Sequence, residues 1–483
     1  METLKPHVAI LASPGMGHLI PLLELAKRLV SLHGFSVLFF VQTTYSSVAQ
    51  SQLLISLPDS PGLNIVELPP ADVSDIPSHA DADTRIGLVM RRSMPALETS
   101  LSDYGSAGPL SALIVDIFGT DAFDIAHKSG LPKYLFCTSS AAFLAYLLYL
   151  PMLHQQTEGE FCDLGGPIMI PGCAPIQIKD LNDAVKDRKS EGYRWFLHHV
   201  RRYKEADGIL VNTWDELDWK SLRALREEDA FKQIPTPSVY PIGPLIKEVQ
   251  TSLRGVECLL WLDKQPPKSV LFVSFGSGGS LSSAQVKELA WGLEQSQQRY
   301  LWVVRRPNDF TQSASFFSSG GNEDDGNPAE YLPVGFLDRT LDVGLVVPCW
   351  APQVEILAHS STGGFLTHCG WNSTLESLVH CVPMIAWPLY AEQRMNAPML
   401  VDLRVAVRPI GAGDGVVGRK EVERVVRLVM EGVEGNELKA KTTQLRDSAI
   451  RTSTVGGIGY NLLCQVANDW KMALDRSLHV KGK

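Results

Sequence analysis

Cysteine pairs are missing from this chain: the eight cysteines among its 483 residues form no Cys-x-x-Cys motif. This spacing argues against a zinc site, a thioredoxin-type motif and a disulfide scaffold, and it favours reduced thiols in the cytoplasm. Positive charge is also in deficit, since 44 Lys and Arg residues stand against 53 Asp and Glu. The net charge of −9 disfavours nucleic acids and anionic membranes as partners, because their phosphates would be repelled.

Leader and membrane signals are weak. The residues before His7 contain no basic n-region and no cleavage pattern, so no signal peptide is predicted. The stretch Tyr134–Leu153 is uncharged and long enough for a membrane span, but it contains Thr138, two serines and Pro151. We therefore expect a buried strand and a core helix there, no stable membrane insertion and a cytoplasmic protein.

Short apolar runs alternate with longer amphipathic stretches, for example Lys133–Cys137 followed by Ala141–Leu150. This alternation predicts mostly parallel sheets covered by helices on both faces. Four prolines between Pro235 and Pro244 can continue neither a helix nor a central strand, and a second alternating series follows. We expect an α/β protein with two doubly wound, Rossmann-like domains. The expected limits are 1–245 for the first domain, 246–258 for a linker, 259–460 for the second domain and 461–483 for a carboxyl-terminal helix that packs back on the first domain.

The segment Asn308–Tyr331 is rich in serine, glycine, asparagine and acidic residues. Such a composition is typical of a long surface insertion, so we expect a solvated loop without chemistry there, with a lid over a cleft as the alternative.

A glycine-rich turn follows the first predicted strand of each half, at Gly15–Gly17 and at Gly276–Gly279. Backbone N–H groups at such a turn can approach a phosphate closely. A dinucleotide fingerprint is incomplete, because Ile20 and Leu281 stand where a third small residue is needed. The pair Arg305-Arg306 could bind the 2′-phosphate of NADP, so an NADP-dependent oxidoreductase of small phenolics remains an alternative.

A candidate general base lies beside the first glycine turn. His18 follows that turn, and Asp116 ends the apolar run Leu113–Val115. The carboxyl ends of parallel strands lie at the same edge of a sheet, where ligands bind. A carboxylate that accepts from one imidazole nitrogen leaves the other nitrogen to take a proton. Thr120 and Asp121 are better placed than Asp116 to cap the next helix.

Few carboxylate or histidine side chains in the sequence have the spacing of metal ligands. Asp81-Ala-Asp83 has the spacing of an Asp-x-Asp metal clasp, but no apolar strand leads into it. We predict a helix start there, capped by Asp or Thr, and a metal-free mechanism without a cofactor.

The 44 residues from Trp350 to Gln393, WAPQVEILAHSSTGGFLTHCGWNSTLESLVHCVPMIAWPLYAEQ, closely resemble the signature box of plant secondary-product UDP-glycosyltransferases, family 1. The resemblance extends to SPGMGHLIP at 13–21, VDIFGTDAF at 115–123 and FGSGG at 275–279, and it points to the hydroquinone and monolignol glucosyltransferase group. It implies the two-domain GT-B fold, with domains that face each other across a cleft. The second domain then holds the donor nucleotide, the first holds the acceptor, and the protein is a monomer.

The resemblance also implies roles for individual side chains. Trp350 offers a flat face on which uracil can stack, and a carboxylate such as Glu376 can accept from both ribose hydroxyls. Gln393 at the end of the box resembles glucose users. The donor-binding set consists of Trp350 and Ala351 near the base, Gln353 and Glu376 at the ribose, Ser277, His368, Asn372 and Ser373 at the diphosphate, and Trp371, Glu392 and Gln393 at the sugar.

The sequence therefore predicts an inverting transfer of glucose from UDP-glucose to a hydroxyl of a small phenolic acceptor, which gives a β-O-glucoside. The acceptor would be hydroquinone, a monolignol, another phenylpropanoid or a flavonoid. His18 is the expected base, Asp116 orients it, and Phe118 is the expected wall of the acceptor pocket. The alternatives are the NADP-dependent oxidoreductase, a glycoside hydrolase and a non-catalytic sugar-nucleotide binder.

Overall fold

The computed structural model describes residues 5–57, 60–77, 80–105, 108–249, 255–313, 327–413 and 415–481. The chain divides into two compact units. Unit 1 comprises residues 1–245 and 451–483, and unit 2 comprises residues 246–450. The expected boundary at residue 460 falls inside the last helix, whereas the units divide at residue 450. Most of the insertion expected at 308–331 lies outside the described residues.

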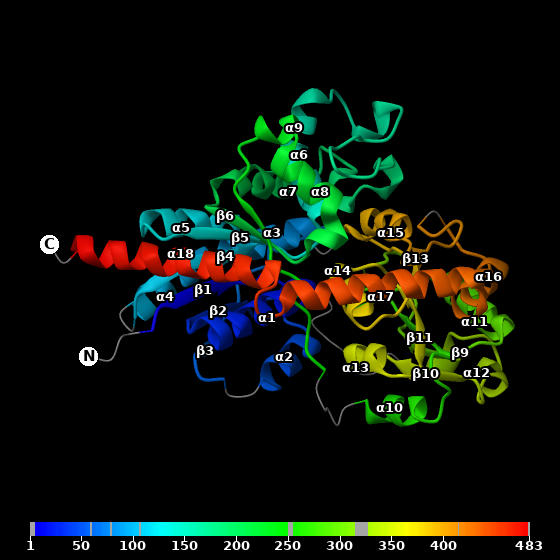
Figure 1. Ribbon diagram of the computed structural model, residues 1–483. Coiled ribbons are helices and arrows are strands. Elements are labelled where there is room, and N and C mark those ends of the chain that lie inside the picture. The colour runs from blue at the N-terminus through cyan, green and yellow to red at the C-terminus, as the bar shows by residue number, and fades with distance from the viewer. Residues whose placement is uncertain are drawn as a thin grey trace. The chain divides into compact units, whose positions relative to one another are not determined.

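Unit 1 contains a seven-stranded parallel sheet with the strand order β3-β2-β1-β4-β5-β6-β7 (Figure 1). The strands are β1 (His7–Leu11), β2 (Ser36–Gln42), β3 (Leu63–Leu68), β4 (Leu110–Asp116), β5 (Lys133–Cys137), β6 (Gly208–Val211) and β7 (Val239–Pro241). The central strands are buried on both faces, which is why they read as continuous apolar runs rather than as alternating patterns. The strand order reverses between β1 and β4, the usual place for a ligand in an open α/β sheet.

Helices pack on this sheet, and several begin at a side-chain cap. Asp81 accepts from the backbone N–H of Thr84 at the start of α3, which confirms the predicted helix start. Ser140 caps α6 in the same way through Phe143. The helices of unit 1 are α1 (Met16–His33), α2 (Val48–Ile55), α3 (Ala82–Arg92), α4 (Met94–Gly105), α5 (Phe123–Lys128), α6 (Ala141–Gln156), α7 (Glu191–Arg202), α8 (Asp215–Glu227), α9 (Asp229–Lys232) and α18 (Ile458–Lys481).

The uncharged stretch forms strand β5 and most of helix α6, as predicted, and both are buried in unit 1. Within the described residues, we find no helix with the length and apolarity needed to cross a bilayer.

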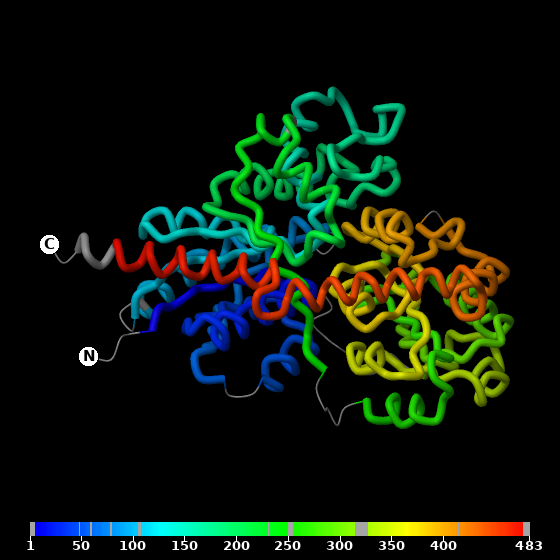
Figure 2. The backbone as a smooth tube through the Cα atoms, in the orientation of Figure 1, coloured from blue at the N-terminus to red at the C-terminus, as the bar shows by residue number. Residues whose placement is uncertain are grey.

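The last helix, α18, packs on unit 1 next to α1, β4 and β7 (Figure 2). Trp470 of this helix is buried, with its ring 5.1 Å from that of Tyr134 and 6.0 Å from that of Phe35. Lys471 donates to the carbonyl of His33 at 2.7 Å. These contacts anchor the carboxyl-terminal segment to the first unit.

Unit 2 contains a six-stranded parallel sheet with the order β10-β9-β8-β11-β12-β13. The strands are β8 (Val270–Ser274), β9 (Arg299–Val304), β10 (Gly344–Pro348), β11 (Thr362–Thr367), β12 (Met384–Ala386) and β13 (Ala406–Val407). The helices are α10 (Val256–Leu262), α11 (Ser283–Ser296), α12 (Phe336–Arg339), α13 (Gln353–Ala358), α14 (Trp371–Val379), α15 (Gln393–Asp402) and α16 (Arg419–Glu431), and α17 (Val433–Ser453) carries the chain past residue 450. Both units are therefore sheets of parallel strands with helical connections, as the alternating pattern predicts.

Candidate functional site

In unit 1 the structure brings His18 and Asp116 into contact. Gly15, at φ 113°, turns the chain into helix α1, whose first turn carries His18. Asp116 is the last residue of β4, which pairs with β1. The Nδ1 atom of His18 lies 3.1 Å from Oδ2 of Asp116. The two predicted residues therefore meet at the carboxyl ends of neighbouring strands, as expected.

Asp116 is completely buried, yet several donors surround its carboxyl group. The backbone N–H and the hydroxyl of Ser13 donate to its two oxygens at 2.8 and 2.5 Å, and the N–H of Phe118 donates at 3.1 Å. Burial alone would raise the pKa of Asp116, but the attraction to His18 and the hydrogen bonds from His18 and Ser13 outweigh it and lower the pKa. Asp116 is therefore a carboxylate that holds the Nδ1–H tautomer of His18, in which Nε2 is the basic nitrogen.

Aromatic side chains adjoin the His18 ring. The ring of Phe118 lies 5.6 Å from that of His18, and it also contacts Phe196 at 6.4 Å and His199 at 6.0 Å. Phe118, predicted as an apolar wall, is thus packed between the candidate base and helix α7. Sequence reasoning did not single out Phe196 or His199, because α7 lies about 80 residues further along the chain.

A second carboxyl group in unit 1 interacts electrostatically with His18. Burial raises the pKa of Asp83 to about 7, and the charges of Asp81 and Asp183 act in the same direction. The Asp81-Ala-Asp83 segment, which the sequence predicts to be a helix start, therefore also contributes an acidic group that interacts electrostatically with the candidate base.

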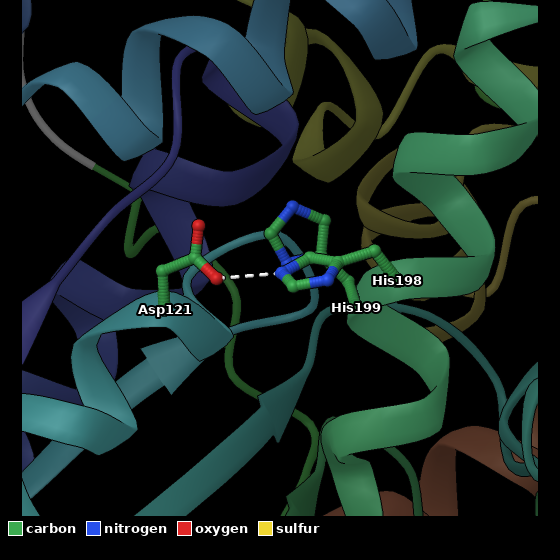
Figure 3. Close-up of side chains that lie close together, drawn as sticks. All are labelled: Asp121, His198 and His199. Atoms are coloured by element: carbon green, nitrogen blue, oxygen red, sulfur yellow. Dashed lines mark hydrogen bonds and ion pairs between the residues drawn. The ribbon is translucent and has the colours of Figure 1, made fainter.

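Asp121 lies beside His198 and His199, as Figure 3 shows. The ligand atoms of these three residues are within 4.8 Å of one another, a grouping that the sequence does not reveal. His198 Nε2 is 2.6 Å from the carboxyl group, and Arg91 and Arg202 also donate to it, at 3.1 and 3.3 Å. Two guanidinium groups so close to the carboxylate fit an ion-pair network better than a cation site.

Thr120 and Asp121, which the sequence places better than Asp116 for capping the next helix, do not cap it. Neither the short 3₁₀ turn at Thr120–Ala122 nor α5 has a side-chain cap hydrogen bond. The hydroxyl of Thr120 instead lies 2.8 Å from Nδ1 of His199, whose pKa burial lowers to about 3. Asp121 instead pairs with the guanidinium groups of Arg91 in α3 and Arg202 in α7, which are stronger partners for a carboxylate than a helix N-terminus is.

The candidate donor-binding residues of unit 2 follow the carboxyl ends of its parallel strands. Ser277 follows β8, Trp350 follows β10, His368 follows β11, and Glu392 lies in the connection after β12. This common edge is where ligands bind in open α/β sheets. Ser277 is exposed there, on the glycine turn.

Glycines surround the ring of His368. A Cβ atom added at Gly276 or at Gly370 would collide with the imidazole, so a larger residue at either position would have to displace the ring. Within the described part of the chain, His368 Nδ1 is buried without a hydrogen-bond partner. Burial, followed by the charge of Arg305, lowers the pKa of His368 to about 4. The ring is therefore a neutral group at pH 7, with a buried nitrogen suited to a polar ligand.

Gln353, Ser373 and Glu376 form a hydrogen-bonded group. The amide Nε2 of Gln353 donates to Ser373 Oγ at 2.9 Å and to Glu376 Oε2 at 2.6 Å. Glu376 is only 4% exposed. Burial raises its pKa to about 7, against the smaller opposing effects of the Gln353 hydrogen bond and the charge of Lys247. The predicted ribose contacts thus lie together at the start of α13 and in the first turns of α14.

Trp350 and Ala351 connect β10 to α13, and Ala351 is buried. The indole of Trp350 is partly exposed and lies near Gly255, where an added Cβ would be 3.4 Å from the ring. An aromatic face in this position can accept a stacked base.

The predicted sugar contacts stand at two helix starts. Trp371, which is buried, begins α14 beside the partly exposed Asn372, and Glu392 precedes Gln393 at the start of α15. The Oε1 atom of Gln393 accepts from the N–H groups of Leu389 and Tyr390, at 3.0 and 3.1 Å. Its amide NH₂ is then the part of the side chain suited to a ligand.

The side chain of Arg305 is not placed to bind a 2′-phosphate. Its guanidinium group donates to main-chain carbonyls of Gly276, Gly279 and Cys349. The exposed Arg306 pairs with Glu330.

Comparison with known proteins places the chain in a family. Residues 254–410 match the family described as UDP-glucoronosyl and UDP-glucosyl transferase. The chain is 49% identical over 476 residues to UDP-glycosyltransferase 72B1 of Arabidopsis thaliana, with 97% of each chain covered. It is 48% identical over 469 residues to hydroquinone glucosyltransferase of Rauvolfia serpentina, with 96% of this chain and 98% of that protein covered.

The fold matches a solved structure of the same kind. UGT2 of Phytolacca americana, complexed with UDP-2fluoro-glucose and pterostilbene, superposes with a TM-score of 0.86 at 44% identity, covering 97% of this chain and all of that one. The two Rossmann-like units are thus those of the GT-B class. These matches overturn the oxidoreductase, hydrolase and non-catalytic alternatives. The chain belongs to the plant family 1 UDP-glycosyltransferases and is an enzyme that transfers a sugar from a UDP-sugar donor.

Proposed function

We propose that the enzyme transfers glucose from UDP-glucose to a hydroxyl group of a small phenolic acceptor, with inversion, to give a β-O-glucoside. The contact between His18 and the buried carboxylate Asp116 carries this proposal. It supplies a base of fixed tautomer beside the aromatic ring of Phe118.

In the proposed reaction, His18 Nε2 takes the proton of the acceptor hydroxyl. The acceptor oxygen forms a bond to the anomeric carbon from the face opposite UDP, while the bond from that carbon to the diphosphate oxygen breaks. Asp116 stabilises the imidazolium that results. One direct displacement inverts the configuration, so an α-linked donor gives a β-glucoside.

A phenol suits this base better than an aliphatic alcohol does. The pKa of a phenol is about 10, as for tyrosine, so less free energy separates it from an imidazolium than separates an alcohol. Phe118 and the neighbouring Phe196 favour a flat apolar acceptor. Hydroquinone, monolignols, other phenylpropanoids and flavonoids fit this description.

The donor roles are assigned to unit 2. Trp350 is the proposed base platform with Ala351 beside it, and Gln353 and Glu376 bind the ribose. His368, Ser277 and the start of α14 with Asn372 and Ser373 stabilise the diphosphate where its charge develops, as oriented dipoles and donors do. Trp371, Glu392 and Gln393 contact the sugar. In this mechanism, hydrogen-bond donors of the protein stabilise the departing UDP.

Glucose is the proposed sugar for two reasons. The Phytolacca americana relative is complexed with UDP-2fluoro-glucose, and the Rauvolfia serpentina relative is a glucosyltransferase by name. The amide of Gln393 can also hydrogen-bond sugar hydroxyls. The monomeric state and the cytoplasmic location remain predictions from the sequence.

The decisive experiment is mass spectrometry of products from a matrix of UDP-sugars and acceptors. The acceptors are hydroquinone, coniferyl alcohol, a flavonol, an aniline and a thiol. We expect a mass gain of one hexose on phenols with UDP-glucose, and an anomeric proton of the product with β coupling. Faster transfer from UDP-galactose, or an α-linked product, would contradict the proposal.

A further inference from the structure

Arg305 joins two loops that lie far apart in the sequence of unit 2. It directly follows β9, which lies between β8 and β10 in the sheet. The turn after β8 carries Ser277, and the turn after β10 carries Trp350. The position of Arg305 at the end of the middle strand therefore places its side chain within reach of both neighbouring turns.

The guanidinium group of Arg305 donates hydrogen bonds to both neighbouring turns. Its Nη1 donates to the carbonyl of Gly276, with a longer contact of 3.4 Å to that of Gly279, and its Nη2 donates to the carbonyl of Cys349 at 3.1 Å. One planar group thus holds the main chain on both sides of β9. A planar fork with several donors in fixed directions can do this, whereas the single ammonium group of lysine cannot reach two separate loops with the same geometry.

The turn after β10 has a backbone conformation that needs support. Gly276 adopts φ 73° without steric cost, but Cys349 has φ 62° although it is not a glycine. Residues with side chains rarely adopt such angles unless the surrounding structure holds them there. The hydrogen bonds from Arg305 act on the carbonyls of these two residues, directly beside Ser277 and Trp350.

We propose that Arg305 is a positioning residue for donor binding, which ties the turn that carries Ser277 to the turn that carries Trp350. It thereby holds the diphosphate contact and the base platform at a fixed spacing. This inference rests on the donor roles in the proposed function. It adds a residue that needs no contact with the donor itself, and it explains why a guanidinium rather than an ammonium group stands at the end of β9.

The test compares Arg305→Lys and Arg305→Met with the matched changes Arg306→Lys and Arg306→Met. Arg306 is the adjacent residue, and its exposed side chain pairs with Glu330 at 3.4 Å. Titration calorimetry gives the dissociation constants of UDP and of uridine for each full-length variant. Steady-state kinetics give KM for UDP-glucose, KM for the acceptor and kcat, and urea unfolding gives the stability.

We expect both Arg305 variants to weaken UDP binding about tenfold and to raise KM for UDP-glucose by a similar factor. Uridine binding, KM for the acceptor and kcat should change less than threefold, because uridine needs only one of the two turns. Both Arg306 variants should match the wild type within twofold. The ratio of UDP affinity to uridine affinity is a readout that a general loss of stability would not move.

Three results would overturn the inference. Wild-type UDP affinity in Arg305→Lys would show that only the positive charge matters. An equal loss for UDP and uridine, or lower stability with unchanged affinity, would show a purely structural role. Should Arg305→Met not fold, the lysine variant, which keeps the stem and the charge, decides alone. Failure of the wild type to bind UDP would refute the proposed function instead, so the two failures are distinct.

Discussion

The Nδ1 atom of His18 lies 3.1 Å from Oδ2 of Asp116, and that carboxyl group has no exposed surface. A buried carboxylate against an imidazole orients the ring and strengthens it as a base. The first two predictions test this relationship.

Replacement of His18 by alanine should lower kcat/KM for ordinary phenols at least 100-fold, because general base catalysis contributes roughly 10²–10⁴-fold. The dissociation constant of UDP, measured by calorimetry, should stay within twofold, since the donor residues stand in unit 2. His127→Ala, at an exposed histidine of helix α5, is the matched control and should behave as the wild type. Unchanged turnover in the His18 variant would refute its role as the base.

Asp116→Asn should keep the shape of the side chain and remove the charge that stabilises the imidazolium. We expect a loss of about 100-fold in kcat/KM for a phenol of ordinary acidity. The loss should be smaller for 4-nitrophenol, because a more acidic hydroxyl needs less help from a base. The measurement is a series of substituted phenols at one pH, and an equal loss across the series would argue for a purely structural role of Asp116.

Glu376→Gln should change how stability depends on pH. Burial raises the pKa of Glu376 in the folded protein to about 7, above the ordinary glutamate value. Between about pH 4.5 and 7 the unfolded chain has released this proton while the folded chain retains it. The wild type therefore loses stability as pH rises through this window, by up to about 3 kcal/mol for this group.

The glutamine variant should lack that component. Urea unfolding of both proteins at pH 4.5 and pH 7 measures it, because the difference between them removes the contributions of other groups. The free energy of unfolding of the variant should increase relative to that of the wild type as pH rises from 4.5 to 7. A constant difference at the two pH values would contradict the assignment of a raised pKa to Glu376.

Gly276→Ala should weaken UDP binding at least tenfold and lower the melting temperature. The added methyl group would collide with the ring of His368, and φ 73° disfavours alanine. Gly418→Ala is the matched control in the same unit, because an added Cβ there meets nothing within 4 Å. Wild-type UDP affinity in the Gly276 variant would show that the ring of His368 can move without cost.

Strand β5 was predictable from its continuous apolar run, whereas the short edge strand β7 was not. Lys133–Cys137 forms β5 with the predicted bounds, because a run this short suits a strand buried on both faces better than a helix. Strand β7 (Val239–Pro241) lies inside the proline-rich stretch that no central strand could contain. It is an edge strand, where a residue without an N–H group is tolerated.

The sequence by itself determined the alternation of strands and helices, the glycine turns, the signature box and the candidate base, because each is a local pattern. Only the tertiary structure decided that Asp121 joins His198 and His199, that Gln353 bonds to Glu376, and that Arg305 holds two loops. The physical reason is that such contacts depend on which strand ends become neighbours in the sheet. The raised pKa of Glu376 and the lowered pKa of His368 likewise depend on burial, which is a property of the packed units.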